Sequence, residues 1–232
     1  GGNSNNGGLT GTFDGNGYTI SNLTIEKIIK RGVGYVGLFG ETAHAQIKNV
    51  TLDKFVYTVE SYSSDATVGA SIGGLVGYAE LTDFTNATVK GTITTGMMEA
   101  NNTHIGGLAG SLHASMENNQ AYIVYVENCY ADLTTALTED GAHESGSVGG
   151  LFGYVNTYES AVAILNCATA GSLRGGMCAG GLAGSITSYV SIINCTSSAS
   201  VRGLATEVTY AGGLVGQCLY DAVIMDSYAT GA

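Results

Sequence analysis

Histidines and acidic side chains, which could bind a metal or catalyse acid–base chemistry, gather in three segments of this chain. They are Glu60, Asp65, Glu99, His104, Glu139, Asp140, His143 and Glu144. A calcium site needs several converging oxygens, and no Asp-x-Asp-x-Asp loop is present. His143 and Glu144 could bind a transition metal, but adjacent residues point apart on a strand. We therefore interpret the cluster as a solvated acidic surface and expect no metal or other cofactor.

The sequence contains few residues arranged for catalysis. Hydrolysis of sugars needs two carboxylates held on rigid strands, and the segments with strand character carry mainly Thr, Ser, Ala and Val. Glu127 and Asp226 occur in such segments but lie far apart. There is no local signature of a Ser-His-Asp or Cys-His nucleophile. We expect that the chain is not an enzyme.

Five cysteines form no Cys-x-x-Cys pair and no zinc-like spacing with the four histidines. Because the count is odd, at least one is unpaired within a monomer. Cys129, Cys167 and Cys195 each follow an Asn, which predicts a column of small buried thiols. A disulfide between neighbours in that column is the alternative. Cys178 and Cys218 flank a glycine-rich phrase, and their pairing is left open.

Tyrosines are the other candidates for ligand contact, since the chain has 14 of them and no tryptophan. If they point outward, Tyr78 and Tyr154 offer stacking surfaces for sugars or proteins. The alternative is that they are ordinary strand residues. The candidate ligand-binding residues are Tyr62, Tyr78, His104, Glu139, Asp140, His143, Glu144 and Tyr154.

Charge and composition exclude several classes of partner. The net charge is −11, and the eight basic residues form no cluster, which argues against nucleic acid. No apolar run approaches the roughly 20 residues of a membrane span, so we expect no membrane insertion. The chain has 36 glycines and no proline, as suits tight turns between fully hydrogen-bonded strands.

A Gly-Gly-Leu-x-Gly phrase occurs six times and indicates a repeat architecture. Its leucines are Leu38, Leu75, Leu108, Leu151, Leu182 and Leu214. A period of this size is typical of one structural unit stacked on copies of itself. A phosphate-binding loop would need a helix to follow the glycines, whereas strand-like residues follow here.

A second repeated phrase centres on an Asn or Asp. Its central residues are Asn22, Asn49, Asn86, Asn128, Asn166, Asn194 and Asp226. A large apolar residue lies two positions before each, and a small or apolar one lies one position after. A continuous strand cannot point both inward, so the chain must bend between them. Asn tolerates a left-handed backbone, which predicts an Asn column at one corner of a stacked coil.

Together the two phrases predict an all-β fold, a parallel β-helix (β-solenoid) of about seven coils. Each coil is expected to contain a strand around Gly-Gly-Leu, a strand ending at the Asn corner and a third stretch such as Thr88–Ile93. Right-handed coiling follows from the bias of parallel crossovers. We expect residues 1–232 to form a single domain, and Asp14-Gly15-Asn16-Gly17 to be a turn.

Irregular spacing between the phrases locates insertions on one edge of the coil. They cover Tyr57–Ala70, Thr94–His104 and Thr134–Ser147. Loops on a rigid scaffold often house binding sites, which favours this edge as a ligand surface. Surface insertions are also tolerated at little cost in stability, so the alternative that these insertions bind nothing stays open.

The Gly-Gly-Leu-x-Gly phrase resembles the GLUG motif of bacterial surface adhesins and of non-catalytic regions in secreted immunoglobulin A proteases. Residues 11–25 resemble the segment that often precedes such arrays, and Val36 departs from the pattern. The resemblance implies a secreted or cell-surface location, a place within a longer protein, and adhesion without catalytic residues. The first hypothesis is therefore an adhesin module that binds host glycan or extracellular protein. A structural spacer or stalk, or a non-catalytic region of a secreted protease, is the second, and a polysaccharide-degrading enzyme is the third. The oligomeric state is left open.

Overall fold

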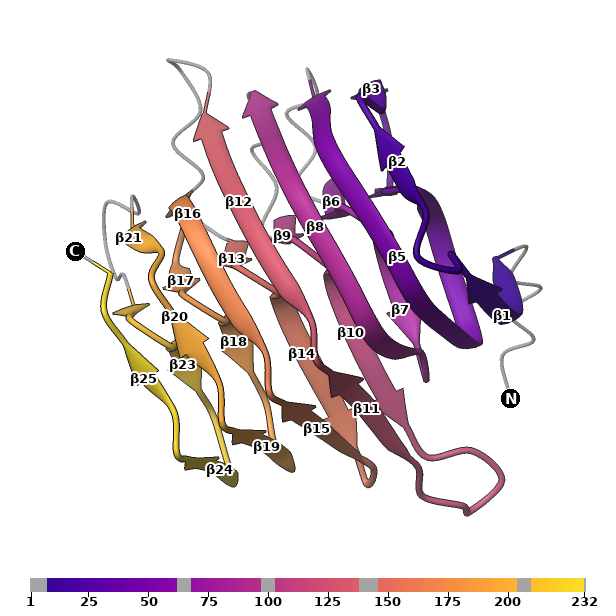
Figure 1. The fold of residues 1–232 in the computed structure, drawn as a ribbon, viewed down its shortest axis with the longest axis vertical. Helices are drawn as coiled ribbons and strands as arrows, with labels where there is room; N and C mark the ends of the chain where they lie inside the picture. The colour runs from indigo at the N-terminus through magenta and orange to yellow at the C-terminus, as the bar shows by residue number, and fades with distance from the viewer. Residues whose placement is uncertain (1–7, 62–67, 97–102, 138–145, 204–209, 232) are drawn as a thin grey trace.

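The computed structural model describes residues 8–61, 68–96, 103–137, 146–203 and 210–231, and every regular element in them is a β-strand (Figure 1). These residues accordingly contain no helix long and apolar enough to cross a membrane. The strands stack coil upon coil, and each coil has four sides, which we call walls 1 to 4.

Walls 1 and 2 come first in each coil. Wall 1 contains β7 (Val76–Glu80), β10 (Ala109–Ser115), β14 (Phe152–Tyr158), β18 (Ala183–Ile186) and β23 (Val215–Cys218). Wall 2 contains β11 (Ile123–Glu127), β15 (Ala161–Leu165), β19 (Val190–Ile193) and β24 (Ala222–Met225). Three strands bend around corners, namely β1 (Leu9–Asp14) in walls 1 and 2, β5 (Phe39–Ser61) in walls 1 to 3, and β8 (Asp83–Gly96) in walls 2 and 3.

Walls 3 and 4 complete the coil. Wall 3 contains β2 (Thr19–Ser21), β3 (Thr24–Ile29), β12 (Tyr130–Leu137), β16 (Ala168–Gly175), β20 (Thr196–Ser197), β21 (Ser200–Gly203) and β25 (Tyr228–Ala229). Wall 4 is a separate six-stranded sheet of β4 (Val33–Val36), β6 (Gly69–Gly73), β9 (Thr103–Gly106), β13 (Gly146–Gly149), β17 (Cys178–Gly180) and β22 (Tyr210–Gly212).

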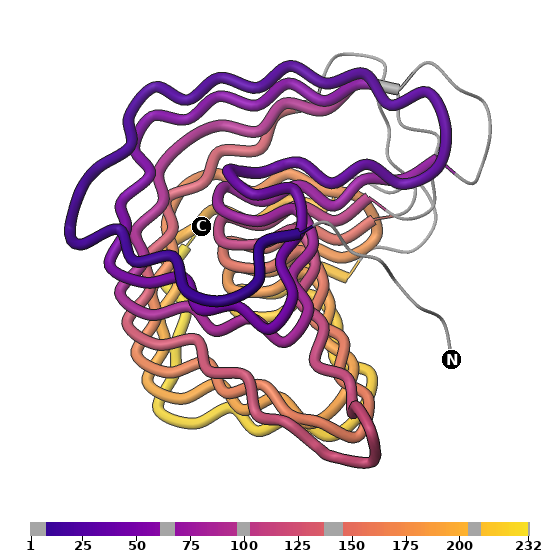
Figure 2. Tube along the Cα trace, turned by 90° about the vertical axis from the view of Figure 1, so that its right-hand side faces the viewer, coloured from indigo at the N-terminus to yellow at the C-terminus, as the bar shows by residue number. Residues whose placement is uncertain are grey.

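The ladders that join successive coils are parallel, which confirms the predicted parallel β-helix. In wall 3, for example, Tyr130 pairs with Thr88 of the coil before and with Ala168 of the coil after. Seven levels follow one another there: β2 with β3, then β5, β8, β12, β16, β20 with β21, and β25. Seen from the N-terminal coil, the chain runs clockwise as it recedes, so the coil is right-handed (Figure 2).

The Gly-Gly-Leu phrase forms the turn between wall 4 and wall 1, which corrects the expectation of one strand around it. Strand β6 ends at Gly73 and β7 begins at Val76, so the leucine lies at the bend. Leu75, like its counterparts in the next three coils, is fully buried. Leu38 and Leu214, which belong to coils nearer the two ends, are only partly buried. The prediction of three strands per coil thus becomes four.

The Asn corner between walls 2 and 3 is confirmed. All seven residues of the repeated phrase have left-handed backbones, with φ between 50° at Asp226 and 60° at Asn22. Side chains of successive corners are hydrogen-bonded along the stack. The Nδ2 of Asn86 donates to Oδ1 of Asn49 at 3.1 Å, and Nδ2 of Asn194 donates to Oδ1 of Asn166 at 2.8 Å.

Asn22, in contrast, does not belong to this corner. Its neighbour Ser21 pairs with Asp53, so Asn22 lies in wall 3 at the level of Lys54, where the ladder register shifts and φ is also left-handed. In the first coil Asp14, which pairs with Lys48 immediately before the corner, continues the side-chain ladder, because its carboxylate accepts a hydrogen bond from Asn49 Nδ2 at 3.0 Å. That bond is the largest of the interactions that lower the pKa of Asp14.

The predicted turn at residues 14–17 is confirmed at the same place. The amide of Tyr18 donates to the carbonyl of Gly15 at 2.8 Å, and the amide of Asn16 donates to Asp14 Oδ1 at 2.9 Å. The segment is the turn between walls 2 and 3 of the first coil.

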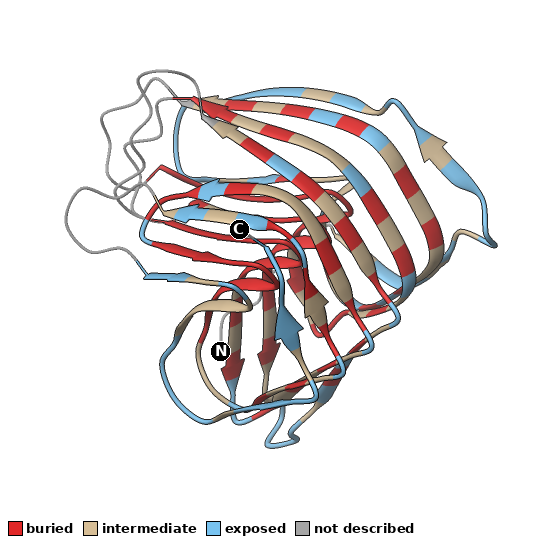
Figure 3. Cartoon of the chain, turned by 60° about the vertical axis from the view of Figure 1, so that its left-hand side comes forward, coloured by how far each residue is buried: buried red, intermediate tan, exposed pale blue. Residues whose placement is uncertain are grey.

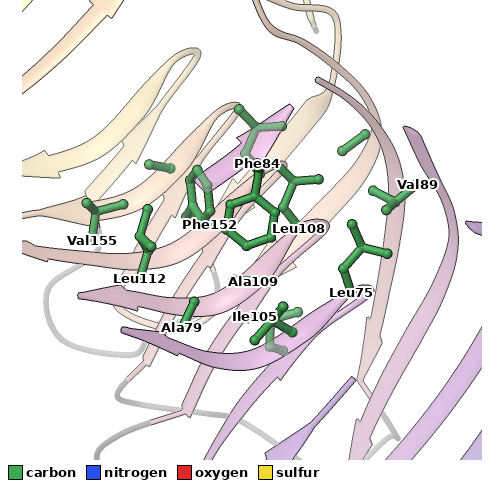
Figure 4. Close-up of a cluster of buried hydrophobic side chains, with 14 of the residues drawn as sticks. Leu75, Ala79, Phe84, Val89, Ile105, Leu108, Ala109, Leu112, Phe152 and Val155 are labelled. Carbon is green, nitrogen blue, oxygen red and sulfur yellow. The ribbon is translucent and has the colours of Figure 1, made fainter. Parts of the chain in front are cut away.

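A continuous apolar core runs along the inside of the coil (Figure 3). Leu108 and Phe84 point into it from different walls, and Phe84 contacts Phe152 edge-on with ring centroids 6.0 Å apart (Figure 4). Tyr57 is fully buried, and its hydroxyl donates to the carbonyl of Gly74 at 2.9 Å. This bond ties wall 3 to the Gly-Gly-Leu turn.

The three corner cysteines are buried free thiols, as predicted, and Cys178 and Cys218 are also unpaired. Two of the three corner thiols accept a backbone hydrogen bond from the coil before them. The amide of Cys129 donates to Cys167 Sγ, and the amide of Cys167 donates to Cys195 Sγ, each at 3.4 Å. The column ends at Ser227, whose hydroxyl accepts from the amide of Cys195 at 3.0 Å. The thiols thus bond the corner along the stack without a covalent link.

Candidate functional site

Five of the candidate ligand-binding residues lie outside the described residues. They are Tyr62, Glu139, Asp140, His143 and Glu144. Asp65 and Glu99 of the acidic cluster lie outside them too. The remaining candidates, Tyr78, His104 and Tyr154, are described and lie close together.

The strands that flank the predicted insertions are aligned from coil to coil. At the end of wall 3, Glu60 pairs with Gly96, and Thr95 pairs with Leu137. At the start of wall 4, Thr103 pairs with both Ala70 and Gly146. Successive insertions therefore leave and re-enter the coil at the same edge, between walls 3 and 4.

Walls 4 and 1 pack directly against each other on their outward sides. A Cβ atom at Gly77 of wall 1 would lie only 2.5 Å from the amide nitrogen of Val36 in wall 4, so the backbones approach at glycine. The residues beside this contact face each other in pairs. Tyr35 stacks on Tyr78 with centroids 5.1 Å apart, and one level further along Ser71 Oγ lies 2.8 Å from Ser111 Oγ.

The next level again has a pair of stacked rings, as Tyr35 and Tyr78 do. His104 of wall 4 stacks on Tyr154 of wall 1, with centroids 4.8 Å apart and ring planes 17° apart. His113, two residues after Ser111, fills the space beside the serine pair. Its ring lies 4.6 Å from that of Tyr78 and 5.9 Å from that of Tyr154. These five residues, Tyr35, Tyr78, His113, Tyr154 and His104, form what we call the ring row.

Both histidines of the ring row are neutral at pH 7. Burial lowers the pKa of each to about 4, and for His104 repulsion from His113 adds to the effect. The Nδ1 of His104 is buried and has no hydrogen-bond partner among the described residues. His113 Nδ1 lies 3.3 Å from Nδ2 of Asn156. Imidazoles in this state act as apolar rings and would oppose protonation.

An acidic side chain lies beside the row. Glu80 Oε2 accepts a hydrogen bond from the hydroxyl of Tyr78 at 3.1 Å, while its Oε1 is buried and has no partner in the part of the chain that the structure describes. Burial and the nearby Glu80 carboxylate raise the pKa of Tyr78. Within the described ranges, no group of three or more His, Cys, Asp or Glu side chains is placed to hold a metal ion.

The geometry defines what the ring row can do. Because Tyr78, His104 and Tyr154 stack on one another or on their neighbours, a ligand could reach their ring edges but could not insert against a free face. Sequence reasoning missed Tyr35, His113 and Glu80. Tyr35 occupies the wall 4 position that Ser71 and His104 hold in later coils, and that equivalence is visible in the repeat alignment.

Comparison with known proteins agrees with the repeat architecture described above. The stacked parallel coils define the class of the protein as a right-handed parallel β-helix with a repeated glycine turn. Residues 68–94, which run from wall 4 through walls 1 and 2 to wall 3, match the family model described as the GLUG motif. This match covers one coil of the array and supports the GLUG resemblance that the sequence predicts.

A curated relative shares part of the repeat array. Over 104 residues, 44% of this chain, the sequence is 36% identical to Halomucin of Haloquadratum walsbyi (strain DSM 16790 / HBSQ001). The chain spans about 1% of the length of that relative. No solved structure matches the chain.

Proposed function

We propose that this chain is a non-catalytic adhesion module of a secreted or cell-surface protein, which binds host glycan or an extracellular protein through the insertions between walls 3 and 4. The observation that carries the proposal is the alignment of these insertions on one edge. Because their flanking strands pair from coil to coil, the insertions start from one rigid line.

A surface location is supported by the comparisons. The GLUG motif lies within the array, and the relative that is 36% identical to it over 104 residues is named Halomucin. The low content of charged residues, 12%, with a net charge of −11, favours an extracellular ligand other than nucleic acid.

The proposal is tested by replacing residues 138–145 with a Gly-Ser pair, which leaves Leu137 and Gly146 in their strands. The intact chain and the variant are screened on a glycan array and a panel of extracellular matrix proteins. We expect the variant to lose binding while its melting temperature stays unchanged. Variants that shorten 62–67, 97–102 and 204–209 in the same way then show which insertions along the edge contribute to binding. If shortening each of the insertions at 62–67, 97–102, 138–145 and 204–209 leaves binding intact, the looped edge is not the binding surface.

A structural spacer is the second candidate, and the regular stacking of seven levels favours it. The coils rise by about 4.8 Å each, so the array makes a rigid rod able to hold another domain at a distance. A pure spacer would bind no ligand on either panel. The third candidate, a polysaccharide-degrading enzyme, would release reducing ends from a polysaccharide and lose that activity on mutation of Glu139 or Glu144.

A further inference from the structure

The outward face of wall 2 contains two hollows, one on each side of β11. The first has a volume of about 320 Å³ and is lined by Gln46, Lys48, Asp83, Thr85, Tyr125 and Glu127. The second has a volume of about 490 Å³ and is lined by Tyr122, Ile123, Glu159, Ser160, Ala161 and Tyr189, among others. The two share β11, whose outward residues Ile123 and Tyr125 form the ridge between them.

The second hollow results from a small residue between two large ones. Ala161 pairs with Ile123 on one side. On the other side Val162 pairs with Val190, so Tyr189, the residue before Val190, lies next to Ala161. Ile123 and Tyr189 are thus two levels apart, or roughly 10 Å at the usual strand spacing. Once the thickness of both side chains is subtracted, the gap over Ala161 accepts one flat ring.

The first hollow is formed in the same way from polar residues. Thr85 pairs with Lys48 on one side and with Glu127 on the other, so a short side chain again separates two long ones. Asp83 lies two residues before Thr85 on the same face, and its Oδ1 accepts a hydrogen bond from the amide of Tyr125 at 2.8 Å. This bond fixes the carboxylate at the foot of the ridge.

Tyr125 and Tyr189 differ from the tyrosines of the ring row. They are 43% and 55% exposed, and no ring contact involves either among the described residues. Their faces are therefore free to stack on a ligand. Free tyrosine faces beside fixed carboxylate and amide oxygens suit the apolar faces and hydroxyl groups of a sugar.

Two observations argue against other ligands. Strand β11 is paired with β8 and β15, and the amide of Ala161 donates to the carbonyl of Tyr122 at 2.9 Å, so no strand edge is open for a peptide to extend. Asp83, Glu127 and Glu159 are acidic, whereas Lys48 lies 3.5 Å from Asp14. An anionic sugar would be repelled, which leaves neutral sugars.

From these contacts we propose that the outward face of wall 2 binds a neutral oligosaccharide, which stacks on Tyr125 and Tyr189 and hydrogen-bonds to Asp83 and Glu127. From β8 to β19 the face crosses three strand spacings, or about 14 Å, which matches a ligand of about three sugar units. The site goes beyond the looped edge proposed above and does not depend on it, because wall 2 and the strand ends that flank the insertions lie on different sides of the coil (Figure 2).

The test uses the whole chain and the neutral trisaccharides maltotriose, cellotriose, mannotriose and triacetylchitotriose. Binding is measured by isothermal titration calorimetry and by tyrosine fluorescence. Because the chain has no tryptophan, tyrosine emission is readable directly. We expect at least one trisaccharide to bind, and Tyr125→Ala and Tyr189→Ala each to weaken it about tenfold. Tyr18→Ala is the matched control, since Tyr18 is 73% exposed and lines neither hollow.

A second variant separates loss of the site from loss of the fold. Ala161→Tyr fills the gap between Ile123 and Tyr189 with a residue that suits a strand, so it should abolish binding with an unchanged melting temperature. Replacing residues 138–145 should leave trisaccharide binding intact, which distinguishes this site from the looped edge. The proposal is overturned if no trisaccharide binds at millimolar concentration, or if Ala161→Tyr binds as well as the native chain.

Discussion

At the scale of single residues, the two buried histidines of the ring row should make stability depend on pH. His104 and His113 have a pKa of about 4 in the fold, below the ordinary value of 6.5. Between those values the unfolded chain binds more protons than the folded one. Stability is therefore complete above about pH 6.5 and falls as the pH drops towards 4, by up to about 3 kcal/mol per histidine.

The measurement is urea unfolding at pH 7 and at pH 4.5, for the native chain and for His104→Phe combined with His113→Gln. Carboxylates titrate in both proteins. The difference between the two proteins in the unfolding free energy lost from pH 7 to pH 4.5 therefore isolates the contribution of the histidines. We expect the variant to lose less stability on acidification. Equal losses in both proteins would show that the ring row does not oppose protonation.

The cysteines offer a second prediction at this scale. Hydrogen bonding with Cys129 and burial raise the pKa of Cys167 to about 12. Hydrogen bonding with Cys167 and burial raise the pKa of Cys195. Cys178 is buried as well, whereas Cys218 is exposed. A thiol reagent should therefore modify one cysteine in the folded protein and all five after unfolding. Rapid modification of two or more thiols in the folded state would contradict the buried column.

At the scale of elements, the Asn corner should tolerate glycine better than alanine. Asn86 has φ of 52° and links its coil to Asn49. Alanine loses the hydrogen bond and strains the left-handed backbone, at about 1–2 kcal/mol for the strain alone. Glycine loses the bond but keeps the conformation without strain. Asn86→Ala should thus unfold at a lower urea concentration than Asn86→Gly, and the reverse order would refute the corner's conformational role.

The contact between walls 1 and 4 gives a matched pair of glycines. A Cβ atom at Gly77 would lie 2.5 Å from Val36 N and 2.6 Å from Gly40 O, all backbone atoms. A Cβ atom at Gly40 would lie no closer than 3.5 Å to any neighbour. We expect Gly77→Ala to destabilise by about 3 kcal/mol or more, and Gly40→Ala to be near neutral. Thermal unfolding of the two variants decides whether the walls need this approach.

Much of the element pattern could be predicted from the sequence. The spacing of three between the apolar residues around each Asn cannot occur in one continuous strand, so it identified the corner. The Gly-Gly-Leu turn was misjudged because glycine and a buried leucine suit a strand and a bend equally. Asn22 was misplaced since a left-handed Asn marks a corner and a bulge alike, and only its pairing partner distinguishes them.

The binding surfaces were harder to predict than the coil. The sequence predicts Tyr78, His104 and Tyr154 as contact residues but not their stacking. The stacking requires walls 4 and 1 to face each other, which depends on the Gly-Gly-Leu turn that the sequence did not predict. Tyr125 and Asp83 were not singled out at all. Their proximity arises from pairing between β8 and β11, which are separated by an irregular insertion near residues 116–121, so the register cannot be counted from the sequence.

At the scale of the whole molecule, protection from exchange should vary along the stack. No residue is buried in 8–28 or in 210–231, whereas the coils between them contain the core. Because each coil contacts only its neighbours, the terminal coils should open first. Hydrogen exchange followed by mass spectrometry should show slow exchange in β7, β10 and β14 and fast exchange in β23 to β25. Uniform protection along the chain would indicate a single cooperative unit.

The facing pairs between walls 4 and 1 also limit how such an array can grow. Along the stack they read Tyr35 with Tyr78, Ser71 with Ser111, His104 with Tyr154, then Ser147 and Ser185 at the corresponding positions. Large and small pairs alternate over these four levels, and the next pair joins the small Cys178 to the longer Gln217, with Sγ 3.4 Å from Oε1. Where the alternation holds, the period on this side is two coils. Duplicating a single coil would place two aromatic pairs, or two serine pairs, on adjacent levels. Gene duplication or protein engineering should therefore lengthen this array in steps of two coils, a parity rule that the one-coil glycine repeat does not reveal.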